Sequence, residues 1–175
     1  MGLVRLASRA VIGSFDRASD LDKVLIDLQK LGVRSVDVSI ISKADVLEST
    51  AASQRGKGPL AAIGKNASWL SEPQTVERAG IGSLAVAGSL GDVMATSLNT
   101  SPTGAIVMQG IPQRDALIYS GILQEGKILV LVGVADRTVG ERVRLVFDHQ
   151  GGQTISYYAG RPYGTAFHGA GPGLR

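Results

Sequence analysis

Residues 10–17, Ala-Val-Ile-Gly-Ser-Phe-Asp-Arg, and residues 128–137, Ile-Leu-Val-Leu-Val-Gly-Val-Ala-Asp-Arg, decide the fold. Each is an apolar run that ends in Asp-Arg, and each is followed by an amphipathic segment, a glycine and a second strand-like run. Gly32 and Gly152 each lie fifteen residues after the arginine of their copy. Two strand-helix-strand units of the same length predict an α+β protein, a ferredoxin-like βαββαβ sandwich.

The first copy has clear helix signals. Ser19 is expected as the N-cap, and Gly32 is expected just past the last turn. Between them, one face of the helix collects the apolar residues Leu21, Val24, Leu25, Leu28 and Leu31. The next strand, residues 35–42, alternates apolar and polar side chains, which predicts one buried and one wetter face of the sheet.

The second copy begins with residues 127–134, a continuous apolar run that is typical of a central strand. Thr138 and Glu141 have the spacing of a capping box, which predicts the start of the second long helix. Its inner stripe is predicted as Val139, Val143, Val146 and Phe147.

A shorter helix is predicted before the second copy, over residues 112–124. Pro112 is expected as its first residue and Gly126 as its stop. We expect this helix to bury Leu117, Ile118 and Ile122.

Residues 44–110 form a long insertion, and residues 159–175 form a tail that is rich in glycine and proline. The sequence therefore predicts one domain, residues 1–158, followed by an extended arm. Within the insertion, small residues recur at every fourth position and would form a ridge on a helix: Ala79, Ser83, Ala87, Gly91 and Ala95. Such a ridge permits close contact with a helix of a partner subunit or, as an alternative, peripheral contact with a membrane.

Composition excludes several classes of chemistry. The 175 residues include no cysteine, which excludes thiol catalysis and cysteine metal sites and makes the cytoplasm the expected compartment. The net charge of +3 is scattered, and residues 127–134 contain no aromatic side chain for stacking on bases, so no nucleic-acid partner is expected. His149 and His168 lack the partners of a catalytic or zinc site, so we expect no metal and no cofactor.

Two Asp-Arg pairs are the candidate ligand-binding residues. Asp16-Arg17 and Asp136-Arg137 each precede a predicted helix, whose free N–H groups can bind an anion. The alternative is an exposed turn with a local ion pair, which is common and contributes little.

A resemblance supports the same fold. Residues 110–132 begin with Gly-Ile-Pro, carry Tyr119 within a helix and end in an apolar strand. In this pattern the chain resembles the bacterial general stress protein 17M-like domain family. The resemblance implies a stress-associated or accessory protein and brings no catalytic residue with it.

These observations favour a non-enzymatic protein that acts by self-association or as a subunit of a larger assembly. The expected interface residues are the small-residue ridge together with Tyr119, Tyr163 and Phe167. Two alternatives stay open: a regulatory domain that binds a small anionic or apolar ligand between subunits, and an enzyme that uses carboxylates from turns.

Overall fold

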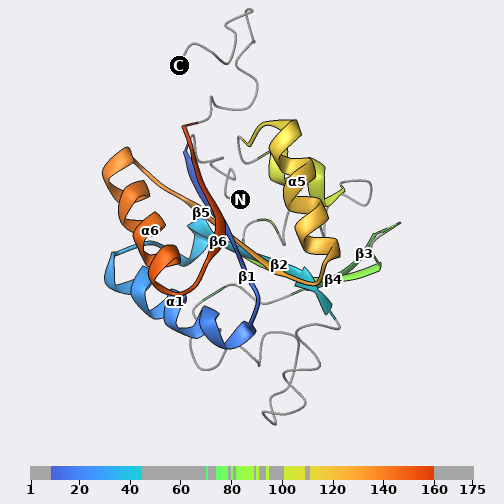
Figure 1. Ribbon diagram of the computed structural model, residues 1–175, viewed down its shortest axis with the longest axis horizontal. Helices are drawn as coiled ribbons and strands as arrows, with labels where there is room; N and C mark the ends of the chain where they lie inside the picture. The colour runs from blue at the N-terminus through green and yellow to red at the C-terminus, as the bar shows by residue number, and fades with distance from the viewer. Residues whose placement is uncertain are drawn as a thin grey trace, which may run out of the picture.

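The computed structural model describes residues 9–44, 70, 74–78, 80, 82–88, 90, 94, 101–108 and 111–159. Within these ranges the protein has an α+β fold, in which helices cover both faces of one antiparallel sheet of six strands (Figure 1). The α+β prediction is therefore confirmed. The predicted arm, apart from Ala159, lies outside the described residues, as do residues 45–69 of the insertion.

The sheet has the strand order β3-β4-β2-β5-β1-β6. Its strands are β1 (Ala10–Phe15), β2 (Val38–Lys43), β3 (Gln74–Arg78), β4 (Gly82–Gly88), β5 (Ile128–Gly133) and β6 (Gln153–Tyr158). The helices are α1 (Ala18–Lys30), α4 (Pro102–Val107), α5 (Gln113–Gln124) and α6 (Arg137–His149), and a short 3-10 helix η1 (Ser35–Asp37) precedes β2. The insertion thus supplies a hairpin, β3 and β4, that extends the sheet beside β2.

Both faces of the sheet are buried. Helices α1 and α6 lie on one face, where Val11, Ile40 and Phe147 share a core. Helices α4 and α5 lie on the other, where Ile12, Ile41 and Tyr119 share a second core (Figure 1). The predicted wetter face is therefore wrong, because α5 covers that side of the central strands.

The helix ends follow the predicted glycines but not the predicted caps. Gly32 and Gly126 have φ angles of +79° and +89°, as expected after a helix. The N-cap of α1 is Arg17, so Ser19 lies inside the helix. The N-cap of α6 is Asp136, and this replaces the predicted capping box. The Asp-Arg turns therefore start both helices earlier than their Ser or Thr residues indicated.

The strand predicted over residues 35–42 begins later than expected. Residues 35–37 form η1 instead, and Arg34 donates a hydrogen bond of 2.8 Å to Asp37 across this turn. As a result Val36 is 62% exposed and does not join the apolar face of β2.

Helix α5 presents a different face to the sheet from the one predicted. Pro112 is its N-cap rather than its first residue, and its buried residues are Ala116, Tyr119, Ser120 and Leu123. Leu117 and Ile118 are 57% and 53% exposed, and Ile122 is only partly buried. Apolar residues occur around most of this helix, so packing rather than periodicity selects its inner face.

The predicted small-residue ridge does not form a helix where the structure describes it. Ser83 and Ala87 lie on strand β4, between Gly82 and Gly88, which both have positive φ angles. Ala79, Gly91 and Ala95 lie outside the described residues. None of the helices that the structure describes is long and apolar enough to cross a membrane.

Candidate functional site

The two Asp-Arg turns lie at opposite ends of the sheet. Strands β1 and β5 are antiparallel, with Phe15 opposite Ile128 and Ala10 opposite Gly133. Asp16 therefore lies where β5 begins, whereas Asp136 lies beyond the end of β5. The structure does not bring the two predicted pairs together into one pocket.

At the Asp136 turn, a backbone N–H group at the start of α6 is already hydrogen-bonded within the turn. One carboxylate oxygen of Asp136 accepts a hydrogen bond of 2.9 Å from the Val139 N–H group in the first turn of α6. This occupies a backbone donor that an anion would need. Arg137 is exposed beside it. The turn acts as a helix cap.

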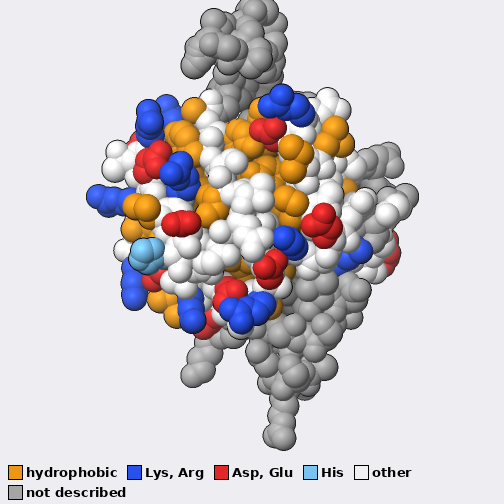
Figure 2. All heavy atoms as spheres, viewed as in Figure 1, with side chains coloured by type: hydrophobic (Ala, Val, Ile, Leu, Met, Phe, Trp, Pro, Cys, Tyr) orange, Lys and Arg blue, Asp and Glu red, His pale blue; other side chains and the backbone are white. Residues whose placement is uncertain are grey.

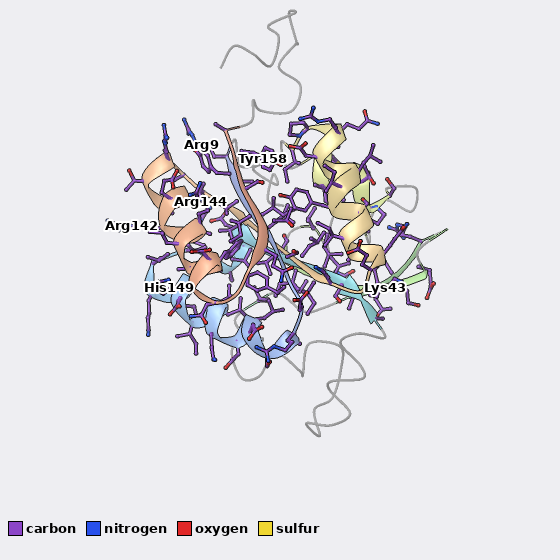
Figure 3. The ribbon with its side chains drawn as sticks, in the orientation of Figure 1. Arg9, Lys43, Arg142, Arg144, His149 and Tyr158 are labelled. Carbon is purple, nitrogen blue, oxygen red and sulfur yellow. The ribbon has the colours of Figure 1, made fainter. Side chains whose placement is uncertain are left out.

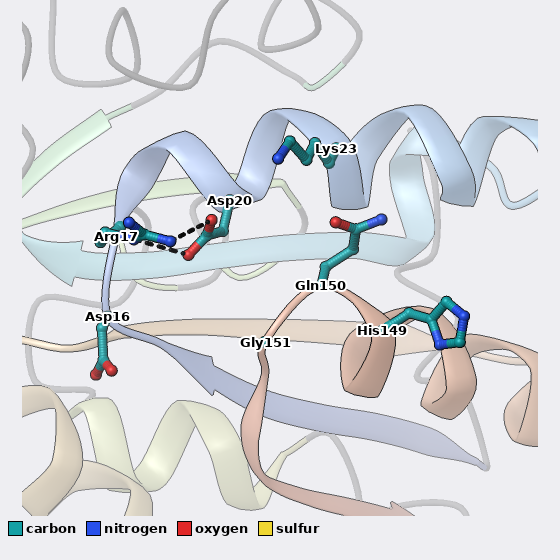
Figure 4. Close-up of a pocket in the computed structure, with 7 residues that line it drawn as sticks. All are labelled: Asp16, Arg17, Asp20, Lys23, His149, Gln150 and Gly151. Atoms are coloured by element: carbon teal, nitrogen blue, oxygen red, sulfur yellow. Dashed lines mark hydrogen bonds and ion pairs between the residues drawn. The ribbon is translucent and has the colours of Figure 1, made fainter.

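The Asp16 turn borders a surface pocket of about 470 Å³. Its walls come from the start of α1 and from the end of α6 (Figure 4). The lining residues are Asp16, Arg17, Asp20, Lys23, His149, Gln150 and Gly151. Sequence reasoning had considered Asp16, Arg17 and His149 separately; it could not bring them together because the turn after α6 is far away in the chain.

Several charges in this pocket are paired within the protein. Arg17 forms an ion pair of 3.3 Å with Asp20. Asp16 lies 3.6 Å from the Lys127 ammonium group and accepts a hydrogen bond of 3.1 Å from the Gln153 amide. The pocket therefore combines both signs of charge, and its acidic groups are directed to partners in the chain.

Two basic side chains in the pocket remain available. Among the described residues, neither Lys23 nor His149 has a hydrogen bond or an ion pair, and both are exposed. They are suited to bind a small, negatively charged molecule, but neither is joined to a nucleophile as catalysis would require.

A second polar cluster ties α5 to β6, and the sequence analysis missed it. The hydroxyl of Tyr158, which is labelled in Figure 3, donates a hydrogen bond of 2.7 Å to Asp115. The Tyr119 hydroxyl donates one of 3.0 Å to the Thr154 carbonyl. Burial is the main cause that raises the pKa of both phenols, and the Asp115 carboxylate raises that of Tyr158 further. The phenols therefore stay protonated and serve as donors. In the sequence, the only local sign of this cluster is the four-residue spacing of Asp115 and Tyr119, which places them on the same face of a helix.

The predicted interface residues have diverse environments. Tyr119 is buried inside the chain, and so is Ala87. The Ser83 hydroxyl donates a hydrogen bond to Glu77 on the neighbouring strand. Tyr163 and Phe167 lie outside the described residues.

Comparison of the chain with protein-family models, with curated proteins and with solved structures finds no match. The part of the chain that the structure describes holds no group of three or more His, Cys, Asp or Glu side chains that could bind a metal ion. What the structure offers is therefore a mixed-charge pocket, a tyrosine cluster and exposed aliphatic side chains.

Proposed function

We propose that this protein is a non-enzymatic accessory protein that acts by self-association or as a subunit of a larger assembly. The observation that carries the proposal is the exposure of Leu117 and Ile118, which are 57% and 53% exposed on one turn of α5. Their neighbours Ala116 and Tyr119 are buried, so the helix is well packed on its inner side. Aliphatic side chains left together on a well-packed helix are typical of a surface that binds another protein.

Gly121 adds to this argument. It lies one turn after Leu117 and Ile118, and no atom of the described residues lies within 4 Å of the position that a Cβ atom would take there. The surface is therefore apolar and low at this point, which lets a partner approach the helix backbone closely.

We infer that the architecture is ferredoxin-like, with a βαββαβ core extended by the hairpin β3-β4 and by α4 and α5. Two observations support this: the order β2-β5-β1-β6 within the sheet, and the position of α1 and α6 on one face. The fold alone does not specify a function. The resemblance of residues 110–132 to the general stress protein 17M-like family supports a cytoplasmic, stress-associated role.

The test is the mass of the full-length protein in solution, measured by light scattering and native mass spectrometry over a wide concentration range. We expect an assembly larger than one chain, or a protein subunit retained from the host. A single chain at every concentration, with no retained subunit, would contradict the proposal.

The pocket beside α1 favours one alternative, a regulatory domain that binds a small anion. Lys23 and His149 are the groups that would bind it. A ligand that binds only the folded state raises the melting temperature. Inorganic phosphate and phosphate-bearing metabolites should therefore raise the melting temperature of the wild-type protein but not that of the Lys23→Ala variant. Lys30→Ala, at the other end of α1, is the matched control and should respond to these ligands as the wild type does. Equal behaviour of the two variants would reject this alternative.

A further inference from the structure

We propose that the outer face of α5 pairs with α5 of a second copy of this chain, antiparallel about a two-fold axis that crosses the middle of the helix. This inference rests on the proposed self-association. It names the surface that performs it and the register in which the two helices meet.

The outer face of α5 is apolar in the middle and charged at its two ends. Positions 114, 118, 121 and 125 follow one another at intervals of four, three and four residues, so they form one line along the helix. The line begins with Arg114, continues with Ile118 and Gly121 and ends with Glu125, and all four are exposed. Leu117, beside this line, is 57% exposed. Figure 2 shows hydrophobic side chains over this helix and charged side chains near both of its ends.

The two end charges lie at the unfavourable ends of their own helix. A helix favours acidic groups in its first turn and basic groups in its last turn, and α1 has this arrangement with Asp20 and Lys30. In α5, by contrast, Arg114 lies in the first turn, Glu125 is the C-cap and the last turn has no basic residue. An antiparallel partner removes this conflict, because each charge then lies beside the end of the other helix that favours it.

The register that pairs these charges also fits the shape of the surface. With the two-fold axis midway between positions 119 and 120, Arg114 lies opposite Glu125 of the second copy, and Ile118 lies opposite its Gly121. No atom of the described residues lies within 4 Å of the position that a Cβ atom would take on Gly121. This leaves room for the Ile118 side chain of the other copy. Because one register satisfies both the charges and the shape, a second copy is the partner that fits this face.

The other charges near the ends of α5 are held on its margins. Asp115 accepts the 2.7 Å hydrogen bond from Tyr158 on the flank towards β6. Lys127, just after the helix, lies 3.6 Å from Asp16 and donates a hydrogen bond of 3.0 Å to Gln153. These groups therefore have partners within the chain.

Arg114 and Glu125 can still form a new contact. Arg114 lies 3.5 Å from Asp115, but its side chain is 92% exposed, so most of its N–H donors face solvent. Among the described residues, the Glu125 carboxylate has no hydrogen bond or ion pair. The two side chains are thus a complementary donor and acceptor without a full set of partners in their own chain.

The first test reverses these charges. Arg114→Glu should raise the Kd of the assembly about tenfold, because like charges then meet at both symmetry-related contacts. The double variant Arg114→Glu/Glu125→Arg should restore the wild-type Kd, since both pairs form again with opposite sign. Arg142→Glu makes the same change on α6, on the other face of the sheet, and is the matched control (Figure 3). Analytical ultracentrifugation gives each Kd, and circular dichroism verifies that the variants are folded.

Disulfide cross-linking tests the register, because the chain has no cysteine of its own. In the proposed pair the two copies of residue 118 lie about 4.5 Å apart along the helix axis, and the two copies of residue 114 lie about 16 Å apart. Ile118→Cys should therefore form a disulfide between copies under mild oxidation, whereas Arg114→Cys should do so only when combined with Glu125→Cys. Leu145→Cys, at a site on α6 that is 60% exposed, is the control and should not cross-link.

The outcomes separate this inference from the proposed function. If Arg114→Glu keeps the wild-type Kd, if the double variant does not restore it, or if Ile118→Cys does not cross-link, α5 is not the paired helix, although self-association stands. Cross-linking of Arg114→Cys alone would reject the antiparallel register. An assembly of one copy of this chain with a different host subunit would reject a second copy as the partner and leave the proposed function standing. A wild-type protein that is a single chain at every concentration, with no retained subunit, overturns both proposals.

Discussion

The two helix-covered faces of the sheet are held in different ways, and the neighbouring residues Tyr157 and Tyr158 illustrate the difference. Tyr157 packs against α6, where a Cβ atom on Gly140 would lie 2.5 Å from its ring. Tyr158 faces the other side and donates a hydrogen bond of 2.7 Å to Asp115 of α5. The α6 face depends on close apolar packing, whereas the α5 face depends on hydrogen bonds at its margin. Substitutions that add atoms should therefore destabilise the α6 face, and substitutions that remove hydrogen-bond donors should destabilise the α5 face.

The largest effect should come from adding one methyl group to the α6 face. In Gly13→Ala, the new Cβ would lie 2.8 Å from the ring of Phe147, which is fully buried and packs edge-on against Phe15. Overpacking of this kind costs about 1–3 kcal/mol. Urea unfolding of the variant should show that its free energy of unfolding is lower than that of the wild type by an amount in this range.

Gly121→Ala is the matched control on the α5 side. Within the part of the chain that the structure describes, no atom lies within 4 Å of its new methyl group. Alanine is favoured over glycine within a helix by about 1 kcal/mol. We expect Gly121→Ala to be neutral or stabilising. Equal losses in the two variants would contradict the difference between the faces.

The next effect should come from removing a donor on the α5 face. Tyr158→Phe deletes the hydrogen bond to Asp115 and should destabilise the protein by about 1 kcal/mol, because this carboxylate is left without its buried partner. Tyr157→Phe keeps the ring that packs against Gly140 and should change stability less. A double-mutant cycle with Asp115→Asn should show that the two residues are coupled. Additive effects of Tyr158→Phe and Asp115→Asn would mean that this hydrogen bond does not stabilise the α5 face.

The same hydrogen bond predicts a dependence on pH. Burial, aided by Asp115, raises the pKa of Tyr158 above its ordinary value of 10. The unfolded chain therefore loses this phenolic proton at a lower pH than the folded protein does. The contribution to stability is complete below about pH 10 and is lost as the pH rises further. We expect the melting temperature of the wild type to fall more steeply above about pH 10 than that of Tyr158→Phe. Parallel curves would contradict this prediction.

The sequence predicted the α6 face better than the α5 face. Its signals there are local: Val143 and Phe147 recur at helical spacing and are fully buried, and Val139 and Val146 pack beside them. On the α5 face, the decisive contacts join residues far apart in the chain, such as Asp115 and Tyr158, and no periodic pattern records them. The sequence also failed to predict that Leu117 and Ile118 are exposed. Apolar residues occur around most of α5, so its sequence did not indicate which face would pack against the sheet.

The candidate site was predictable only in part. The repeated Asp-Arg pairs were expected just ahead of two helices, and the structure places the N-caps within them, at Arg17 and Asp136, rather than at the predicted Ser19 and Thr138. Their separation follows from the antiparallel pairing of β1 with β5. The meeting of Lys23 with His149 in one pocket depends on how the end of α6 lies beside α1, and a sequence does not specify that distance.

The smallest effect should arise where both faces meet, at the bulge in β6. Thr154 and Ile155 lie opposite Gly13 alone, and Thr154 has a φ of +49°, a left-handed conformation that is unfavourable for a β-branched residue. Thr154→Gly keeps the carbonyl that accepts the Tyr119 hydrogen bond and removes a strain of about 1–2 kcal/mol. The added flexibility of the unfolded glycine offsets about 0.5–1 kcal/mol of this gain. We therefore expect a net stabilisation of about 0.5 kcal/mol, as the difference between these two terms.

Thr75→Gly, in the ordinary strand conformation of the other edge, has no such strain to relieve and should be destabilising. Chemical unfolding of both variants distinguishes the two cases, and a loss of stability in Thr154→Gly would show that the bulge does not strain this residue.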